Sequence, residues 1–129
     1  MTYISPKLRR HVEDRSQHQC EYCQMPDSLS FYSHEVDHVI ATKHGGTTTL
    51  DNLAYDCWRC NRYKGSDLGS FDPESGRFCF LFNPRQQNWE DHFMLQTLQI
   101  LGKTPEGRTT AHLLRFNTQE RMTERRRIP

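Results

Sequence analysis

Residues 35–65 read EVDHVIATKHGGTTTLDNLAYDCWRCNRYKG and hold most of the side chains in this chain that can do chemistry. The pair Asp37 and His38 lies in a run of strand-like composition. A loop rich in Gly and Thr follows, and Asn52 comes after it, at a short second strand or the approach to one. Residues 58–64 predict a helix that ends at Gly65. Several short elements are therefore expected to bring these side chains together.

Two Cys-x2-Cys pairs, one upstream and one inside this segment, supply four thiolates: Cys20, Cys23, Cys57 and Cys60. A tight Cys-x2-Cys turn lets two thiolates converge on one ion, and four thiolates complete the tetrahedral shell of zinc with no open position. The pattern therefore predicts a structural zinc site that ties the N-terminal segment to the start of the helix at residues 58–64. Free or disulfide-bonded cysteines are the alternative interpretation.

The remaining polar side chains suit phosphodiester hydrolysis, which needs an activated water, a cation near the phosphate and groups that hold both. His38 can accept a proton near neutral pH. Asp37 and Asn61 offer hard oxygen ligands for Mg²⁺, and Asn52 is suited to hydrogen-bond His38 or its backbone. Adjacent residues of a regular strand point to opposite faces, so Asp37 and His38 can share a site only if the chain bends there.

These residues and their spacing, His38-x13-Asn52-x8-Asn61 framed by both Cys pairs, resemble the HNH endonucleases, here as an HNN variant. The resemblance implies an α+β fold built on a ββα-metal core (the His-Me finger). It implies that His38 is the general base, that Asp37 and Asn61 bind the catalytic metal and that Asn52 orients the site. Asn61 stands where the third His is usual, which favours Mg²⁺ or Mn²⁺ over softer metals.

The resemblance also extends to segments outside the central motif, which are similar to those of small stand-alone bacterial HNH proteins. These segments include residues 81–85, 89–93 and 104–108. They carry no information about the substrate. The family resemblance implies DNA, and the sequence leaves RNA open.

Further side chains near the motif have two interpretations each. Glu35 shares strand parity with Asp37, so it either faces the catalytic metal or pairs with Arg62 or Lys64. Arg62 and Lys64 are the expected phosphate contacts. Trp58, like Tyr63, either stacks on a base or belongs to the core.

Composition limits the class of protein. The 129-residue chain is expected to be a single domain, and with only 34% hydrophobic residues it can bury only a modest core, so a metal ion would have to add stability. Its net charge of +1 is no nucleic-acid signature, although Lys and Arg cluster near both ends and inside the motif. No signal-peptide-like or membrane-spanning run is visible in the sequence, so we expect a soluble, cytoplasmic protein without a membrane partner.

We expect one HNH nuclease domain over residues 1–129. Residues 1–30 would supply a helix and half of the zinc knuckle, residues 31–66 the ββα-metal motif, and residues 67–129 an accessory cover. Within these parts the patterns predict helices at 6–17 and 109–125 and strands at 31–40, 78–82, 89–95 and 98–101.

Two functions therefore compete. The first is a metal-dependent HNH endonuclease, a hydrolase that cuts phosphodiester bonds in DNA. The second is a non-catalytic zinc module that binds nucleic acid or a protein, which explains the cysteines but not the joint presence of Asp37, His38, Asn52 and Asn61. A redox role for the Cys-x2-Cys pairs is a weaker third interpretation.

Overall fold

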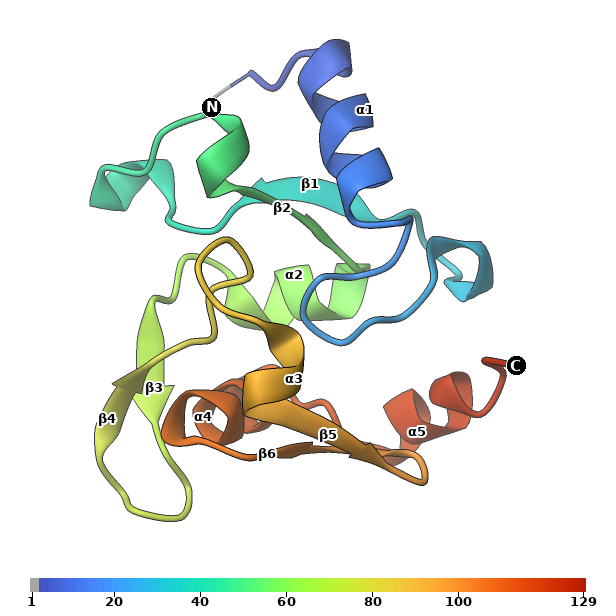
Figure 1. Ribbon diagram of the computed structural model, residues 1–129, viewed down its shortest axis with the longest axis vertical. Helices are drawn as coiled ribbons and strands as arrows, with labels where there is room; N and C mark the ends of the chain where they lie inside the picture. The colour runs from blue at the N-terminus through green and yellow to red at the C-terminus, as the bar shows by residue number, and fades with distance from the viewer. Residues whose placement is uncertain (1–2) are drawn as a thin grey trace.

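The computed structural model describes residues 3–129 (Figure 1). Helix α1 spans Pro6–Arg15, with the Ser5 hydroxyl accepting a hydrogen bond from the Leu8 amide and Pro6 in the first turn. The helix is two residues shorter than the sequence suggests. Gln17 and His18 adopt φ values of 59° and 60°, and this left-handed backbone ends the helix.

The central feature is an antiparallel pair of strands, β1 (Glu35–His38) and β2 (Leu53–Asp56). Glu35 lies opposite Asp56 and His38 lies opposite Leu53. Since side chains alternate along a strand, Glu35 and Asp37 share one face while Val36 and His38 belong to the other. The predicted strand over 31–40 was too long, because residues 31–33 are exposed and outside the ladder.

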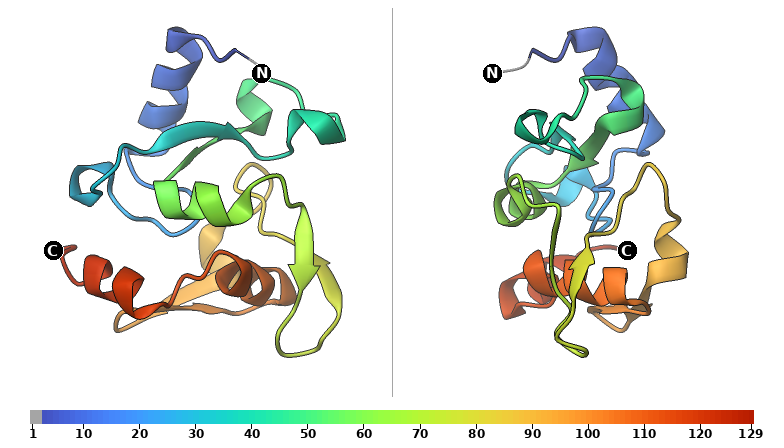
Figure 2. Two further views of the ribbon diagram at one scale, coloured as in Figure 1. Left: turned by 180° about the vertical axis from the view of Figure 1, so that it is seen from behind. Right: turned by 90° about the vertical axis from the view of Figure 1, so that its left-hand side faces the viewer.

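Helices cover the β1–β2 pair on two sides (Figures 1 and 2). Helix α1 packs on one side in a small apolar cluster made of Ile4, Val12, Val36, Leu53 and Tyr55. Helix α2 (Trp58–Lys64) lies on the other side, between the strands and the C-terminal elements. It runs from the Cys57 N-cap to Gly65, which has a φ of 51°, as the sequence predicts.

A connection of fourteen residues, 39–52, joins β1 to β2 and turns twice as 3-10 helix, at Thr42–His44 and Leu50–Asn52. Gly45 ends the first turn with a φ of 90°. Gly46 lies directly on the Ile40 carbonyl, where a Cβ atom would come within 1.7 Å of the oxygen. Only Gly permits this close approach, which folds the loop back over the end of β1.

The C-terminal half consists of β3 (Gly69–Phe71), β4 (Phe78–Phe80), α3 (Trp89–His92), β5 (Phe93–Gln96), β6 (Gln99–Gly102), α4 (Pro105–Leu113) and α5 (Gln119–Arg125). Two predictions are corrected here. The expected strand at 89–95 begins as a helical turn, and the expected helix at 109–125 is two helices separated at Arg115, whose φ is 53°. Thr104 and Thr118 cap the separate helices.

The larger apolar core joins the cysteines to the C-terminal half. Cys20, Cys23, Cys57 and Cys60 lie in one buried cluster with Phe82, Phe93, Ile100, Leu114 and Phe116. Residues 67–129 therefore pack directly against the cysteine cluster, and the mixture of helices and antiparallel strands agrees with the predicted α+β class. No helix in the described range 3–129 is long and apolar enough to span a membrane.

Candidate functional site

The four predicted zinc ligands, Cys20, Cys23, Cys57 and Cys60, converge in the structure. Their Sγ atoms all lie within 4.8 Å of one another, and all four side chains are buried. Backbone amides of the knuckle turns point at the sulfurs, with the Cys23 amide 3.4 Å from Cys20 Sγ and the Cys60 amide 3.4 Å from Cys57 Sγ. Such amides stabilise thiolates.

The sulfur separations fit a shared metal ion rather than a disulfide. Cys23 Sγ and Cys57 Sγ are 3.6 Å apart, where a disulfide requires about 2.05 Å. Two thiolates on one tetrahedral zinc ion, each bonded at about 2.3 Å, are roughly 3.8 Å apart. The four cysteines could therefore hold a metal ion such as zinc.

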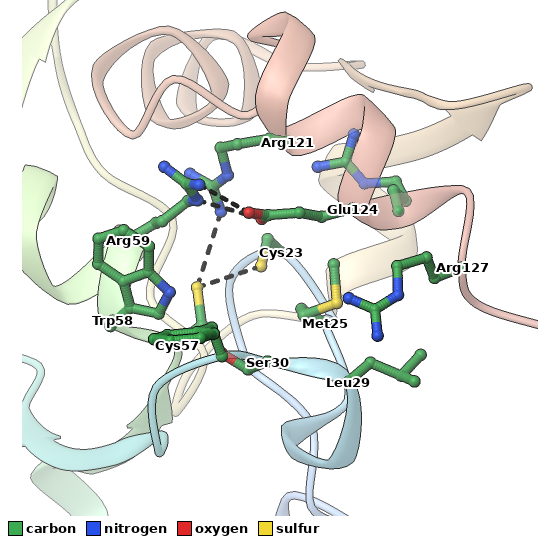
Figure 3. A pocket seen from close by; sticks show the side chains of 12 residues that line it. Cys23, Met25, Leu29, Ser30, Cys57, Trp58, Arg59, Arg121, Glu124 and Arg127 are labelled. Carbon is green, nitrogen blue, oxygen red and sulfur yellow. Dashed lines mark hydrogen bonds and ion pairs between the residues drawn. The ribbon is translucent and has the colours of Figure 1, made fainter.

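A buried arginine from α5 adjoins this sulfur cluster (Figure 3). One terminal nitrogen of Arg121 lies 3.1 Å from Cys60 Sγ and 3.7 Å from Cys57 Sγ, and the other donates to the Leu114 carbonyl. Burial opposes the charge of Arg121, but the neighbouring Cys60, Cys23 and Cys57 raise its pKa above the ordinary value. The guanidinium thus offsets part of the negative charge that four thiolates bring into the core.

A second group of polar side chains lies where α2 meets β1. Asn61 Nδ2 donates to Glu35 Oε2 at 2.9 Å, and Lys64 Nζ donates to the Val39 carbonyl at 2.9 Å. In the sequence Asp37 lies two residues after Glu35 and two residues before Val39, so along a strand all three belong to the same face. The two hydrogen bonds therefore hold α2 beside the stretch of chain from which the Asp37 carboxylate, one-third exposed, projects.

His38 is held beside Asp37 although the two residues are neighbours on a strand. His38 Nδ1 lies 4.0 Å from Asp37 Oδ1, and Nε2 lies 2.9 Å from the Thr48 hydroxyl. Both residues are regular positions of the ladder, which stops at His38, and the chain bends only after it, at residues 39–40. The Thr48 hydroxyl therefore occupies Nε2, while Nδ1 is the ring nitrogen near the Asp37 carboxylate.

Asn52 does not hydrogen-bond His38, contrary to the expectation from sequence. Its Oδ1 accepts from the Ile40 amide, and its Nδ2 donates to the carbonyls of Ile40 and Thr47. The buried amide thus closes the loop between the strands. It acts on His38 only indirectly, because the loop it closes carries Thr48.

One of the two predicted phosphate contacts, Lys64, lies differently from expectation, and Glu35 has a partner that the sequence did not suggest. Lys64 is buried, at 3% exposure, and its ammonium group is bound inside the protein, so it is not presented to a phosphate. Arg62 is exposed on α2 and makes no ion pair within residues 3–129. Glu35 accepts a hydrogen bond from Asn61, rather than pairing with either basic residue.

One buried carboxyl in this region was missed from the sequence. Asp56 lies on the face of β2 that carries Glu35 and Asp37 on β1, is 2% exposed, and leaves Oδ1 without a partner in the described chain. Burial raises its pKa well above the ordinary value, as does Asp37, while Lys64 lowers it. The alternation of the strand would have placed Asp56 on this face, but no local pattern signals its burial.

Comparison with known proteins identifies the region that contains both the four cysteines and the polar group around Asp37. Residues 20–67 match the HNH endonuclease family, which confirms the family expected from the sequence. The chain is also 27% identical, over 120 residues, to the Septu protein PtuB of Bacillus thuringiensis. That alignment covers 91% of this chain and 44% of the relative, so the chain spans less than half the length of the relative. None of the solved structures matches this chain.

Proposed function

We propose that this chain, whose residues 20–67 carry the HNH match, is a metal-dependent endonuclease that hydrolyses phosphodiester bonds in DNA. Elements β1, β2 and α2 would form its ββα-metal core. The observation that carries the proposal is the set of hydrogen bonds Asn61–Glu35, Lys64–Val39 and His38–Thr48, which link the residues on either side of Asp37 to α2 and to the loop. These three contacts join α2, the end of β1 and the loop at one place.

Two metal sites with different tasks follow from the donor types. The four buried thiolates suit a structural Zn²⁺, because the saturated shell leaves no position for substrate. Asp37 and Asn61 would hold Mg²⁺ or Mn²⁺ through hard oxygen atoms, with Glu35 adjacent to Asn61. When bound there, the divalent ion would stabilise negative charge on the phosphate and the leaving oxygen.

His38 is proposed as the general base. Thr48 holds Nε2, so the free Nδ1 can take a proton from a water molecule on the Asp37 side. Asn52 keeps the loop closed around Thr48, and the exposed Arg62 is positioned to bind a phosphate of the strand. Lys64 serves to fix α2 to the chain after β1.

The test is cleavage of plasmid DNA by the zinc-loaded protein with Mg²⁺ or Mn²⁺. We expect the wild-type protein to cut and His38→Ala to lose at least about 100-fold in rate, the contribution usual for a general base. His44→Ala is the matched control, since His44 is exposed in the neighbouring loop, and it should cut normally. Zinc content and circular dichroism of both variants should equal those of the wild-type protein.

Two results would contradict the nuclease assignment. In the first, the wild-type protein binds DNA but cleaves neither plasmid DNA, linear DNA nor RNA when Mg²⁺ or Mn²⁺ is present. That result would favour the non-catalytic zinc module. The other is cleavage by His38→Ala at the wild-type rate, which would move the chemistry away from this site.

A further inference from the structure

Three aromatic side chains form an exposed cluster beside the N-terminal end of α2. Phe31 is 88% exposed and Tyr32 is 56% exposed. The rings of Phe31 and Tyr32 are 4.8 Å apart, and the rings of Tyr32 and Trp58 are 5.0 Å apart, both edge to face. Exposed aromatic groups of this size commonly mark a binding surface. Phe31 and Tyr32 belong to the part of the predicted strand 31–40 that lies outside the ladder.

This aromatic cluster lies close to the proposed catalytic residues. Trp58 and Asn61 are three positions apart on α2, so they share a face and are separated by about 4.5 Å along the helix axis. Tyr32 and Glu35 are likewise three positions apart and contact Trp58 and Asn61 respectively.

Positive groups adjoin the same cluster. Arg59 stacks over Trp58, with its guanidinium carbon 4.4 Å from the ring centroid, and is fixed there by Glu124. Arg127 lines the same pocket as Phe31 and Trp58, and Figure 3 shows it across that pocket from Trp58. Arg127, like Arg62 on α2, is exposed and makes no ion pair within residues 3–129.

These charges distinguish the cluster from a second exposed aromatic surface. Phe71, Phe78 and Phe80 lie on one face of the β3–β4 hairpin, and the three side chains are exposed to about the same degree as one another. The pocket beside Phe80 is lined by Asp67 and Glu106, which would repel a phosphate backbone. The cluster at α2 combines exposed aromatic side chains with exposed guanidinium groups, the pairing that binds single-stranded nucleic acid.

We propose that Phe31 and Tyr32 form a stacking site for an unpaired base of the substrate, with Arg62 and Arg127 binding the flanking phosphates. The substrate class is therefore nucleic acid with a single-stranded segment at the cleavage site, because bases within a duplex hide their faces in the stack. Placing this site next to the scissile phosphate rests on the proposed function. The stacking itself depends only on the aromatic cluster.

The test is binding of a fluorescein-labelled DNA strand of about 12 nucleotides, and of a hairpin duplex, to zinc-loaded protein without added Mg²⁺ or Mn²⁺. Phe31→Ala should raise Kd for the single strand about tenfold, since one stacked base accounts for a change of that order. Phe71→Ala is the matched control, an exposed Phe outside the cluster, and should change Kd by less than about twofold. The duplex should bind both variants about equally.

The outcomes separate this proposal from the nuclease assignment. If Phe31→Ala and Phe71→Ala bind the single strand alike, or if Phe31→Ala weakens duplex binding equally, the stacking site is wrong whatever the protein cleaves. If the single strand binds through Phe31 while no substrate is cut, the stacking site stands and the nuclease assignment fails. Absence of any binding to either DNA form also overturns the stacking site.

Discussion

Thr48 sets the orientation of His38 through the hydrogen bond to Nε2. Replacing it by Val keeps the shape but removes the hydroxyl partner of Nε2, so the ring can rotate or change tautomer. We expect Thr48→Val to lower kcat for cleavage about 10- to 100-fold with little change in KM, as is usual for residues that orient a catalytic group. Thr48→Ser should recover most of the rate.

Thr47→Val is the control for Thr48, because the Thr47 hydroxyl hydrogen-bonds the exposed Thr49 hydroxyl and not His38, while the Thr47 carbonyl still accepts from Asn52. If Thr47→Val and Thr48→Val lower kcat equally, the effect belongs to the loop as a whole and not to the Thr48 hydroxyl. A Thr48→Val enzyme with an unchanged kcat would remove Thr48 from the mechanism.

Arg121 offers a second test at a single side chain. Its removal leaves thiolate charge buried without its partner, and breaking such a buried pair commonly costs about 3–5 kcal/mol. We expect Arg121→Met to release zinc to a chelator at lower chelator concentration and to unfold at lower denaturant concentration than the wild-type protein. Arg126→Met, at the exposed end of α5, should match the wild-type protein in both measurements.

The sequence predicted the cysteine set because Cys-x2-Cys spacing is a local pattern with a direct chemical meaning. It did not predict Thr48 or Arg121. Thr48 meets His38 through a loop closure, and Arg121 reaches Cys60 from 61 positions away, so both contacts depend on how distant segments pack. The expected bond from Asn52 to His38 failed for the same reason, because the loop backbone lies nearer to the amide.

The β3–β4 hairpin is attached to α4 by a charged pair that predicts acid sensitivity. Arg108 donates two hydrogen bonds to the buried Asp72 carboxylate, and these, together with hydrogen bonds from the Glu74 amide and the Ser75 hydroxyl, hold the pKa of Asp72 well below its usual range. A depressed pKa stabilises the fold above the unfolded-state value near 3.9. That contribution is lost as the pH falls toward the folded-state value.

We therefore expect Asp72→Asn to be less stable than the wild-type protein at pH 7 and the difference to shrink as the pH falls below about 4. Urea midpoints measured for both proteins across this range give the comparison. Glu74→Gln is the control, because Glu74 is mostly exposed and contacts Arg108 only at 3.3 Å. A constant difference between Asp72→Asn and the wild-type protein at all pH values would contradict the linkage.

Elements with a local signal were predicted well and elements defined by packing were not. The Ser5 cap and Gly65 end marked α1 and α2 within two residues. The strand at 89–95 was wrong at its start, because residues 89–92 form a helical turn from which Trp89 packs on Phe93, the first residue of β5. The single helix at 109–125 was wrong because Arg115 adopts a left-handed backbone conformation that its residue type does not signal.

We expect the fold to depend on the proposed zinc ion, because the four cysteines lie in the core that joins the N-terminal segment to the C-terminal half. Structural zinc contributes about 10–16 kcal/mol of apparent binding energy, comparable to the 5–15 kcal/mol that stabilises an ordinary domain. We expect chelation, or Cys57→Ser, to abolish most of the folded circular dichroism signal and the protection of the core amides. Cys79→Ser, outside the cluster, should change neither.

Folded protein that is free of zinc by elemental analysis would contradict this dependence. Cys57→Ser that retains stoichiometric zinc and a wild-type melting transition would do so as well. Refolding on return of Zn²⁺ after chelation would separate loss of the ion from irreversible aggregation.

Helix α2 carries Cys60 and Asn61 as consecutive residues, one directed to the sulfur cluster and the other to Glu35. Each position on an α-helix is rotated by about 100° from the one before it. A single residue inserted between these two would turn Asn61 to another side of the helix while the knuckle stayed intact. The register of α2 (Trp58–Lys64) is therefore constrained by both partners at once.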